Sequence, residues 1–587
     1  MMLFPHDPAA VHVIYRSPMG DIEAFPVINA LAAGNWGENA VYESWGTGVM
    51  SFSIPSLFPQ VLGTALLGNY WGYIAADIFV TLAFFLLFRA WCRLFSASEG
   101  WANFIAAIFA SGLPEIYVYL GQIWGQRLPR PFVNNLYFIM GIAFLVWMIW
   151  KPERWRAWLP WSIIGLILAL SLQGSVYYIP AFFMAITYIV VIWVMKDFRE
   201  MPLVVGRLGC ALGIFVILDI PFLIQGLMES PDAMGRFGVF PVDRWSIWAN
   251  PVWRDTDGAF LFGMYCLMML ALFNLFARQL KLPVLPWRVL GLLAVLQIGA
   301  LLALPLTAML TGKLVQPYHF IAVSHYMETC MLVAWVSYVG GGLIPRLAIA
   351  PFLAGGLLAW SFYVVTVREI VADHSLGHLR PDIYTPPGPD YHDALTKLAR
   401  ELDKDSYRDD RVVATTDHEI YVYWVGFHHG FAFLPDSFTT TLSNHEIEDR
   451  LLWFAREGGL GAGDLTRFLD QKAIMLFWLE HDRYQCSPLY QKASLSDYSP
   501  EDIVRNFDHP PDLGSFALAL PKGDLARLQD RYAQILAQPE MEKPRLDLII
   551  LTTDLRQFPL PGPNPARYKL TYHDAYFQIW KARKDLP

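Results

Sequence analysis

The sequence has few charged residues for its length. Only 16% of its 587 residues are Asp, Glu, Lys or Arg, and 55% are hydrophobic. A soluble globular chain has about 25% charged residues, so this composition excludes an ordinary soluble enzyme and a disordered chain. The formal net charge of −8 lacks the basic excess of a nucleic-acid-binding protein. We therefore expect no nucleic acid partner.

Cysteine is also scarce. Four of the five cysteines fall in or beside apolar runs, which leaves Cys486 alone in the charged C-terminal part. A disulfide within that part is therefore impossible, which suits a bacterial envelope protein with an ordinary hydrophobic core. The sequence has no internal repeat and no glycosylation sequon.

Long apolar runs dominate the first two thirds of the chain. A membrane-spanning helix needs about 20 mostly apolar residues, and aromatic residues mark many of the run ends. The sequence predicts a polytopic α-helical membrane protein of about ten spans. They lie near residues 70–88, 101–121, 132–150, 158–173, 176–195, 203–228, 259–277, 286–310, 320–343 and 347–367.

The loops between these runs carry an alternating bias in Lys and Arg. Cytoplasmic loops are enriched in these residues, and the basic loops follow the first, third, fifth and seventh spans. This bias predicts a multi-pass protein of the inner (cytoplasmic) membrane. Residues 1–69 and everything after residue 368 are then outside.

The chain divides into three parts. Residues 1–69 form an outer segment with an acidic motif and an interfacial helix at 51–69, residues 70–367 form the transmembrane domain, and residues 368–587 form a soluble extracytoplasmic domain of α/β or α+β type. The alternative of a span at 54–69 is weaker because Pro55 and Pro59 interrupt it. Because residues 1–69 must cross the membrane to lie outside, we expect either a span at 54–69 or a further helix upstream.

The soluble domain has both kinds of periodicity. Four candidate strands are 412–416, 473–479, 546–553 and 576–581, and three candidate helices are 391–402, 447–457 and 524–537.

Four acidic residues lie within the predicted spans, all in the outer halves: Asp77, Glu115, Asp219 and Glu328. Charged residues inside a membrane are costly and often functional. Hydrogen bonding between helices is the structural alternative for each one. Four on the same side predict a polar cavity that opens toward the outer leaflet.

The outer N-terminal segment contains Asp21-Ile22-Glu23. Carboxylates two residues apart point the same way on an extended chain but not on a helix. Such a pair can bind a divalent cation, Mg or Mn, or supply a general base. An acidic-x-acidic triplet is common by chance, so the hypothesis depends on its position in the outer segment.

Basic residues occur at two places on the outer side. Arg127 and Arg130 lie in a proline-stiffened loop, and Lys313 and His319 precede the ninth span. All four are candidate phosphate ligands, although Arg can also anchor a helix end to lipid headgroups.

The ninth span carries His325 three residues before Glu328, on one helix face. The two are candidate metal ligands or a proton relay, and a core histidine is the alternative. Gly312-Lys313 lacks the glycine and hydroxyl spacing of a P-loop. In the soluble domain, Asp417-His418-Glu419 and His428-His429 lack the spacing of a zinc protease, and we expect solvated or core roles for them.

The order of these features resembles the GT-C superfamily, integral membrane glycosyltransferases that use polyprenyl-phosphate-linked sugars. The resemblance rests on the acidic pair, the stretch Ile28-Asn29-Ala30-Leu31-Ala32-Ala33-Gly34, the proline-bearing segment ending Leu66-Leu67-Gly68, the Arg-Leu-Pro-Arg-Pro loop at 127–131, and the C-terminal outer domain. One departure is that the usual first transmembrane helix does not precede the acidic loop.

The resemblance implies transfer of a sugar, hexosyl or pentosyl, from a polyprenyl-phosphate donor to a glycan, lipid or protein acceptor outside the membrane, with inversion. It assigns Asp21 as the base and Glu23 as an assisting residue or metal ligand. Arg127, Arg130, Lys313 and His319 would hold phosphate, and Glu115, Asp219, His325 and Glu328 would line the cavity. The alternatives are a lipid-linked oligosaccharide polymerase or ligase and a non-enzymatic transporter or flippase of lipid-linked glycans.

Overall fold

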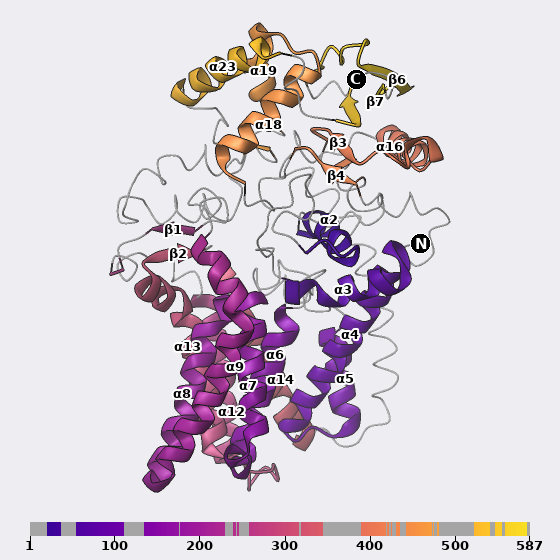
Figure 1. The fold of residues 1–587 in the computed structure, drawn as a ribbon. Coiled ribbons are helices and arrows are strands. Elements are labelled where there is room, and N and C mark those ends of the chain that lie inside the picture. The colour runs from indigo at the N-terminus through magenta and orange to yellow at the C-terminus, as the bar shows by residue number, and fades with distance from the viewer. Residues whose placement is uncertain are drawn as a thin grey trace.

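A long bundle of helices and a smaller body with a β-sheet form the two parts of the molecule (Figure 1). The computed structural model describes residues 20–36, 54–110, 134–174, 176–228, 239–241, 244–245, 257–315, 319–343, 389–417, 420–421, 424, 430–434, 442–471, 474, 478–479, 522–539, 546–553 and 558–583. Within these residues the small body lies at one end of the bundle, and the helices α2 and α3 and the strands β1 and β2 lie near the junction.

The bundle consists of apolar helices. Those described are α4 (Asn69–Leu94), α5 (Glu99–Ala110), α6 (Asn134–Trp150), α7 (Trp158–Gly174), α8 (Ile179–Lys196), α9 (Met201–Met228), α12 (Asp257–Leu275), α13 (Trp287–Thr311) and α14 (His319–Leu343). The first nine predicted spans each overlap one of these helices, and the tenth, at 347–367, lies outside the described residues. Among the described residues, three stretches are long and apolar enough to cross a membrane: Val176–Lys196, Phe198–Ile224 and Trp287–Thr311.

Helix α14 lies at the centre of this packing, and most of its described side chains are buried. Two tryptophans fix neighbouring helices to its backbone. Trp91 Nε1 on α4 donates to the Cys330 carbonyl at 3.0 Å, and Trp101 Nε1 on α5 donates to the Val336 carbonyl at 3.1 Å. A buried indole N–H requires such an acceptor, so these bonds set how α4 and α5 lie against α14.

The N-terminal segment forms two short helices, α2 (Gly20–Ala32) and α3 (Ile54–Leu67). With 14 residues, α3 is shorter than a span requires, and the interfacial position of 51–69 stays a prediction. The chain then turns at Gly68, whose φ is 82°, a conformation that favours glycine. The return is tight, because a Cβ on Gly63 would lie 2.3 Å from the Gly72 carbonyl oxygen.

The smaller body contains a five-stranded mixed sheet in the order β4-β3-β5-β7-β6. Strand β3 (Val412–Ala414) pairs in parallel with β4 (Phe431–Ala432) and β5 (Leu548–Thr552), whereas β7 (Phe577–Ala582) is antiparallel to β5 and to β6 (Tyr568–His573). The helices α16 (Pro389–Leu402), α18 (Asn444–Glu457), α19 (Leu465–Leu469) and α23 (Lys522–Ala537) accompany it.

Three predicted strands and all three predicted helices of this body are present, and the strand predicted at 473–479 is wrong. There Ile474 and Trp478 are helical, and the Leu479 amide donates to the Ile474 carbonyl at 2.9 Å, five residues back. Both side chains are buried, so the apolar run reflects burial, which a short run does not assign to strand or helix.

The two N-terminal helices belong to the core of the C-terminal body. Val27, Ile28 and Leu31 of α2 and Leu57 of α3 lie in one buried hydrophobic cluster with residues of the sheet such as Ile549. The rest of the bundle has a separate cluster. Parts of the chain that are hundreds of residues apart therefore meet at the head of the bundle.

Candidate functional site

The acidic motif lies on α2, not on an extended segment. Gly20 is the first residue of the helix, so Asp21 and Glu23 are both in its first turn. Positions two apart on an α-helix differ by about 200° around the axis. The extended geometry, in which the two carboxylates would point the same way, therefore does not apply to this segment, and the role of Asp21 and Glu23 stays a prediction.

Helix α3 has an unusual distribution of polar residues. Ser56, Gln60 and Thr64 are spaced by four and form one face of the helix, and all three are buried. Phe58 and Leu66, on the other side, are 51% and 71% exposed. The polar face therefore points into the protein and the apolar face points out, as expected of a helix next to lipid.

Two side chains of this buried face lack hydrogen-bond partners. Both atoms of the Gln60 amide are buried and make no hydrogen bond, and the same holds for Thr64 Oγ1. Burying a polar group without a partner costs about 1–3 kcal/mol in proteins, so these groups are unfavourable for packing alone. The spacing of Ser, Gln and Thr by four in 54–67 is the sequence signal for this face, and it lies outside the pattern of acidic and basic residues.

Asp219 forms a second buried polar group at the same end of the bundle. Gln173, at the end of α7, donates through Nε2 to Asp219 Oδ1 at 2.6 Å and to the Leu218 carbonyl at 3.1 Å. Asp219 is fully buried, and its Oδ2 has no hydrogen-bond partner. Pro221 stands inside α9 and cannot donate a backbone hydrogen bond. The missing donor is the one that would reach the Ile217 carbonyl, so the amide of Gln173 bonds α9 directly beside this interruption.

The other predicted cavity residues differ in placement. Glu328 is buried on α14 and interacts electrostatically with Cys266 of the adjacent α12, so the structure places it within helix packing. The backbone of His325 lies on α14, and its side chain is outside the described residues. Glu115 is also outside them, and so are Arg127 and Arg130.

Lys313 and His319 do not share one loop. Lys313 begins β2 (Lys313–Val315), which pairs antiparallel with β1 (Val239–Pro241), and His319 is the first residue of α14. The pairing brings a cation that the sequence did not single out. Arg244 packs over Gly312, with its Nε 3.4 Å from the position of a Cβ there. Arg244 and Lys313 are both exposed, and neither makes a salt bridge with another described residue.

The described residues contain no group of three or more His, Cys, Asp or Glu side chains that could hold a metal ion. The sequence predicted a solvated or core role for the 417–419 motif, and Asp417 has one. Its buried carboxylate accepts from the Ile420 amide at 3.1 Å and from Thr552 Oγ1 at 3.4 Å. His428 and His429 lie outside the described residues.

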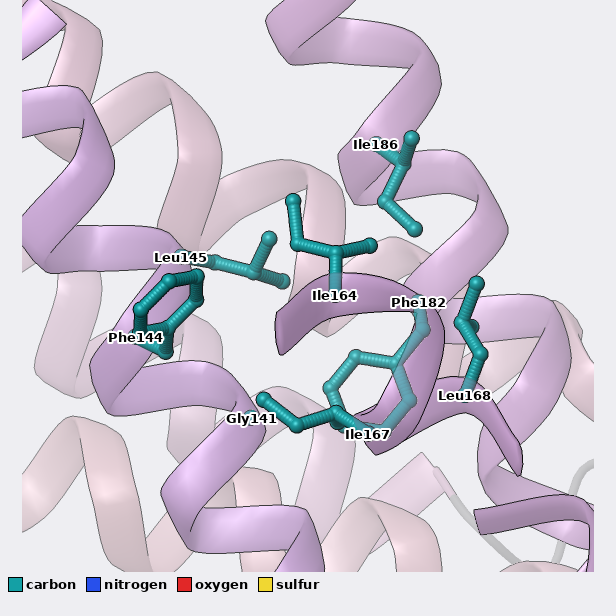
Figure 2. Close-up of a pocket in the computed structure, with 8 residues that line it drawn as sticks. All are labelled: Gly141, Phe144, Leu145, Ile164, Ile167, Leu168, Phe182 and Ile186. Atoms are coloured by element: carbon teal, nitrogen blue, oxygen red, sulfur yellow. The ribbon is translucent and has the colours of Figure 1, made fainter. Parts of the chain in front are cut away.

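An apolar pocket lies within the bundle, between α6, α7 and α8 (Figure 2). Its eight lining residues carry no polar side chain. Gly141 makes a close approach possible, because a Cβ there would lie 2.6 Å from Phe182 Cζ and 3.0 Å from Ile167 Cγ2. Such a pocket offers no group for acid–base chemistry, so the candidate site is the polar one at the head of the bundle.

The comparisons with known proteins yield little. No protein-family model matches the sequence, and no curated protein matches it. Among solved structures, the chain is similar to the crystal structure of ArnT from Cupriavidus metallidurans bound to undecaprenyl phosphate. The two share 13% sequence identity at a TM-score of 0.36, over 97% of this chain and 94% of that one. A likeness of this size assigns no activity.

Proposed function

We propose that this protein is a membrane glycosyltransferase that transfers a sugar from a polyprenyl-phosphate-linked donor to an acceptor, on the side of the membrane where the C-terminal body lies. One observation carries the proposal. The acidic helix α2 shares its core with the C-terminal sheet and packs on α3, whose polar face is buried. An acidic helix at the junction of a membrane bundle and a soluble domain is suited to a substrate with a lipid tail and a polar head.

The chemistry assigns different tasks to the different charges. The acceptor oxygen attacks the anomeric carbon, the bond from that carbon to the phosphate oxygen breaks, and the acceptor proton passes to Asp21 as the general base. Inversion follows from this single displacement. The leaving polyprenyl phosphate gains negative charge, which cations stabilise. Arg244 and Lys313 are the described candidates, and Arg127, Arg130 and His319 remain proposals from the sequence.

The buried amide and hydroxyl groups of α3 have a place in the same scheme. Gln60 and Thr64 lack partners inside the protein, and a sugar presents hydroxyl groups that both donate and accept hydrogen bonds. A site whose buried polar groups are satisfied only by the correct ligand discriminates strongly against ligands that lack those groups. We assign the sugar of the donor to this face, and the acceptor to the C-terminal body.

A divalent metal is not part of the proposed step. Asp21 and Glu23 occupy helix positions about 200° apart, an arrangement that does not by itself favour chelation of one ion. Glu23 therefore keeps an assisting role, and Mg or Mn dependence is a separate question. Addition of a chelator to the transfer assay answers it.

The direct test is a donor comparison with the purified full-length protein in liposomes. One sample contains a radiolabelled sugar on polyprenyl phosphate, a second contains an oligosaccharide on polyprenyl pyrophosphate, and both contain a mixed extract of envelope acceptors. Labelled product from the first donor alone supports the proposal. Product from the second donor alone indicates the polymerase or ligase. Movement of labelled lipid across the bilayer without any product indicates the transporter.

A further inference from the structure

A buried arginine lies at the opposite end of the bundle, remote from the candidate site. Arg207, near the start of α9, is only 7% exposed. Its Nε donates to the Arg156 carbonyl at 2.7 Å, and its guanidinium carbon lies 3.5 Å from the centre of the Trp158 ring. Its Nη1 is buried and has no hydrogen-bond partner. A charged group buried without an acceptor is unfavourable unless something else compensates it.

No carboxylate in the described part of the chain forms an ion pair with Arg207, and Glu200 is engaged by Arg156. Glu200 accepts from both Nε and Nη2 of Arg156, the former at 2.9 Å, and also from the Trp193 indole. The segments 151–156 and 196–207 carry six basic side chains and three acidic ones. The basic residues are Lys151, Arg154, Arg156, Lys196, Arg199 and Arg207, and the acidic ones are Glu153, Asp197 and Glu200. This corner thus has excess positive charge and one buried cation without an anion.

The surroundings of Arg207 are apolar and open to the outside. Trp158 is 56% exposed, Leu159 is 69% exposed and Val205 is 61% exposed. Such side chains at the ends of apolar helices face lipid at the membrane boundary. A ligand that reaches Arg207 past these residues must therefore combine an apolar body with an anionic group.

We propose that Arg207, positioned by the Trp158 ring and the Arg156 carbonyl, is the binding site for the phosphate of an anionic phospholipid. The phosphate accepts from the guanidinium, which recognises phosphate oxygens in a planar, two-pronged fashion, while the acyl chains lie along the exposed apolar residues of α7 and α9. Basic pockets between membrane helices bind anionic headgroups in this way. The site is independent of the proposed transfer reaction.

The test uses full-length protein, stripped of lipid in a neutral detergent, and native mass spectrometry with added phosphatidylglycerol or phosphatidylcholine. We expect the wild type to prefer phosphatidylglycerol and Arg207→Gln to bind it at least fivefold more weakly. Arg199→Gln is the control, because Arg199 is an exposed basic residue of the same corner, and we expect it to retain the preference. Arg207→Lys keeps the charge without the planar donor pair, and we expect it to lose most of the preference.

Three results would overturn the proposal. An equal loss in Arg207→Gln and Arg199→Gln would mean that the whole surface attracts anions without a site. Equal binding of the two lipids by the wild type would show that the protein does not select an anionic phospholipid over a zwitterionic one. If glycerol phosphate in solution competes as well as the lipid does, the site takes a free phosphate compound and not a lipid. If Arg207→Gln does not fold, Arg207→Lys and the wild-type competition decide.

Discussion

Gln173 Nε2 lies 2.6 Å from Asp219 Oδ1 and joins the end of α7 to the interrupted part of α9. The pair shows how an ionisable residue inside an apolar helix is accommodated. One carboxylate oxygen accepts from a side-chain amide, and the other is buried without a partner. Asp219 is therefore held in place on one side only, which suits a residue that also meets a ligand or a proton.

Removal of the Gln173 amide takes away the donor of a buried carboxylate oxygen. In Gln173→Leu, Asp219 Oδ1 loses its hydrogen bond from Nε2, at a cost of about 1–3 kcal/mol for a buried group. We expect a lower midpoint of thermal unfolding in detergent. Gln279→Leu is the control, because Gln279 is exposed, and it should melt like the wild type. Equal midpoints for the two variants would contradict the proposed role of Gln173.

A substitution at Gln60 distinguishes an effect on stability from an effect on function. Its amide is buried and makes no hydrogen bonds, so replacement by an apolar residue of similar size should not destabilise the fold. We expect Gln60→Met to melt at or above the wild-type temperature and to transfer sugar about five- to tenfold more slowly, since a lost hydrogen bond is worth about 1 kcal/mol or somewhat more. A variant that keeps full activity would remove α3 from the donor site.

The exposed cations of the β1–β2 pair offer an electrostatic test. The double variant Arg244→Gln and Lys313→Gln should raise the KM for the lipid-linked donor, and the effect should shrink in high salt because exposed charges are screened. The control variant removes the same charge from the other end of the bundle, at the exposed residues Arg278 and Lys281. If both variants change the KM equally, the β1–β2 cations have no specific role.

The apolar pocket in the bundle predicts a steric effect. Any side chain at Gly141 would collide with Phe182 and Ile167, and overpacking costs about 1–3 kcal/mol. Gly141→Leu should therefore lower the midpoint of thermal unfolding. A Cβ on Gly209 of α9 meets nothing within 4 Å, so Gly209→Leu is the matched control and should unfold like the wild type. Destabilisation of both would show that glycine in these helices matters for another reason.

Much of the bundle could be predicted from the sequence because the hydrophobicity of long runs determines where its helices lie. A run of about 20 apolar residues has few alternatives to a spanning helix, and the predicted run at 286–310 corresponds to α13, Trp287–Thr311. The short strands of the sheet are harder to predict from the sequence. β4 has two residues and depends on its pairing with β3, a long-range contact that leaves no local periodicity.

For the candidate site, the sequence indicated which acidic and basic residues to consider but not how they are arranged in space. Acidic residues inside spans identified Asp219, but nothing in the sequence singled out its partner Gln173. Arg244 and Lys313 are far apart in the sequence, and only the β1–β2 pairing places them at one junction. The sequence alone did not decide between an extended and a helical segment at Asp21, and the structure has a helix there. Residues that are close in space but far apart in the sequence leave no periodic pattern, so a single sequence does not reveal such contacts.

In the proposed mechanism Asp21 is the base of sugar transfer. The most direct measurement is the rate of transfer from a polyprenyl-phosphate-linked sugar in liposomes by the Asp21→Asn variant, with Asp530→Asn as the control, because Asp530 is exposed on α23. General base catalysis contributes about 10²–10⁴-fold. We predict a loss of this size for Asp21→Asn, with unchanged expression and melting, and a wild-type rate for Asp530→Asn. A wild-type rate for a folded Asp21→Asn would contradict the account.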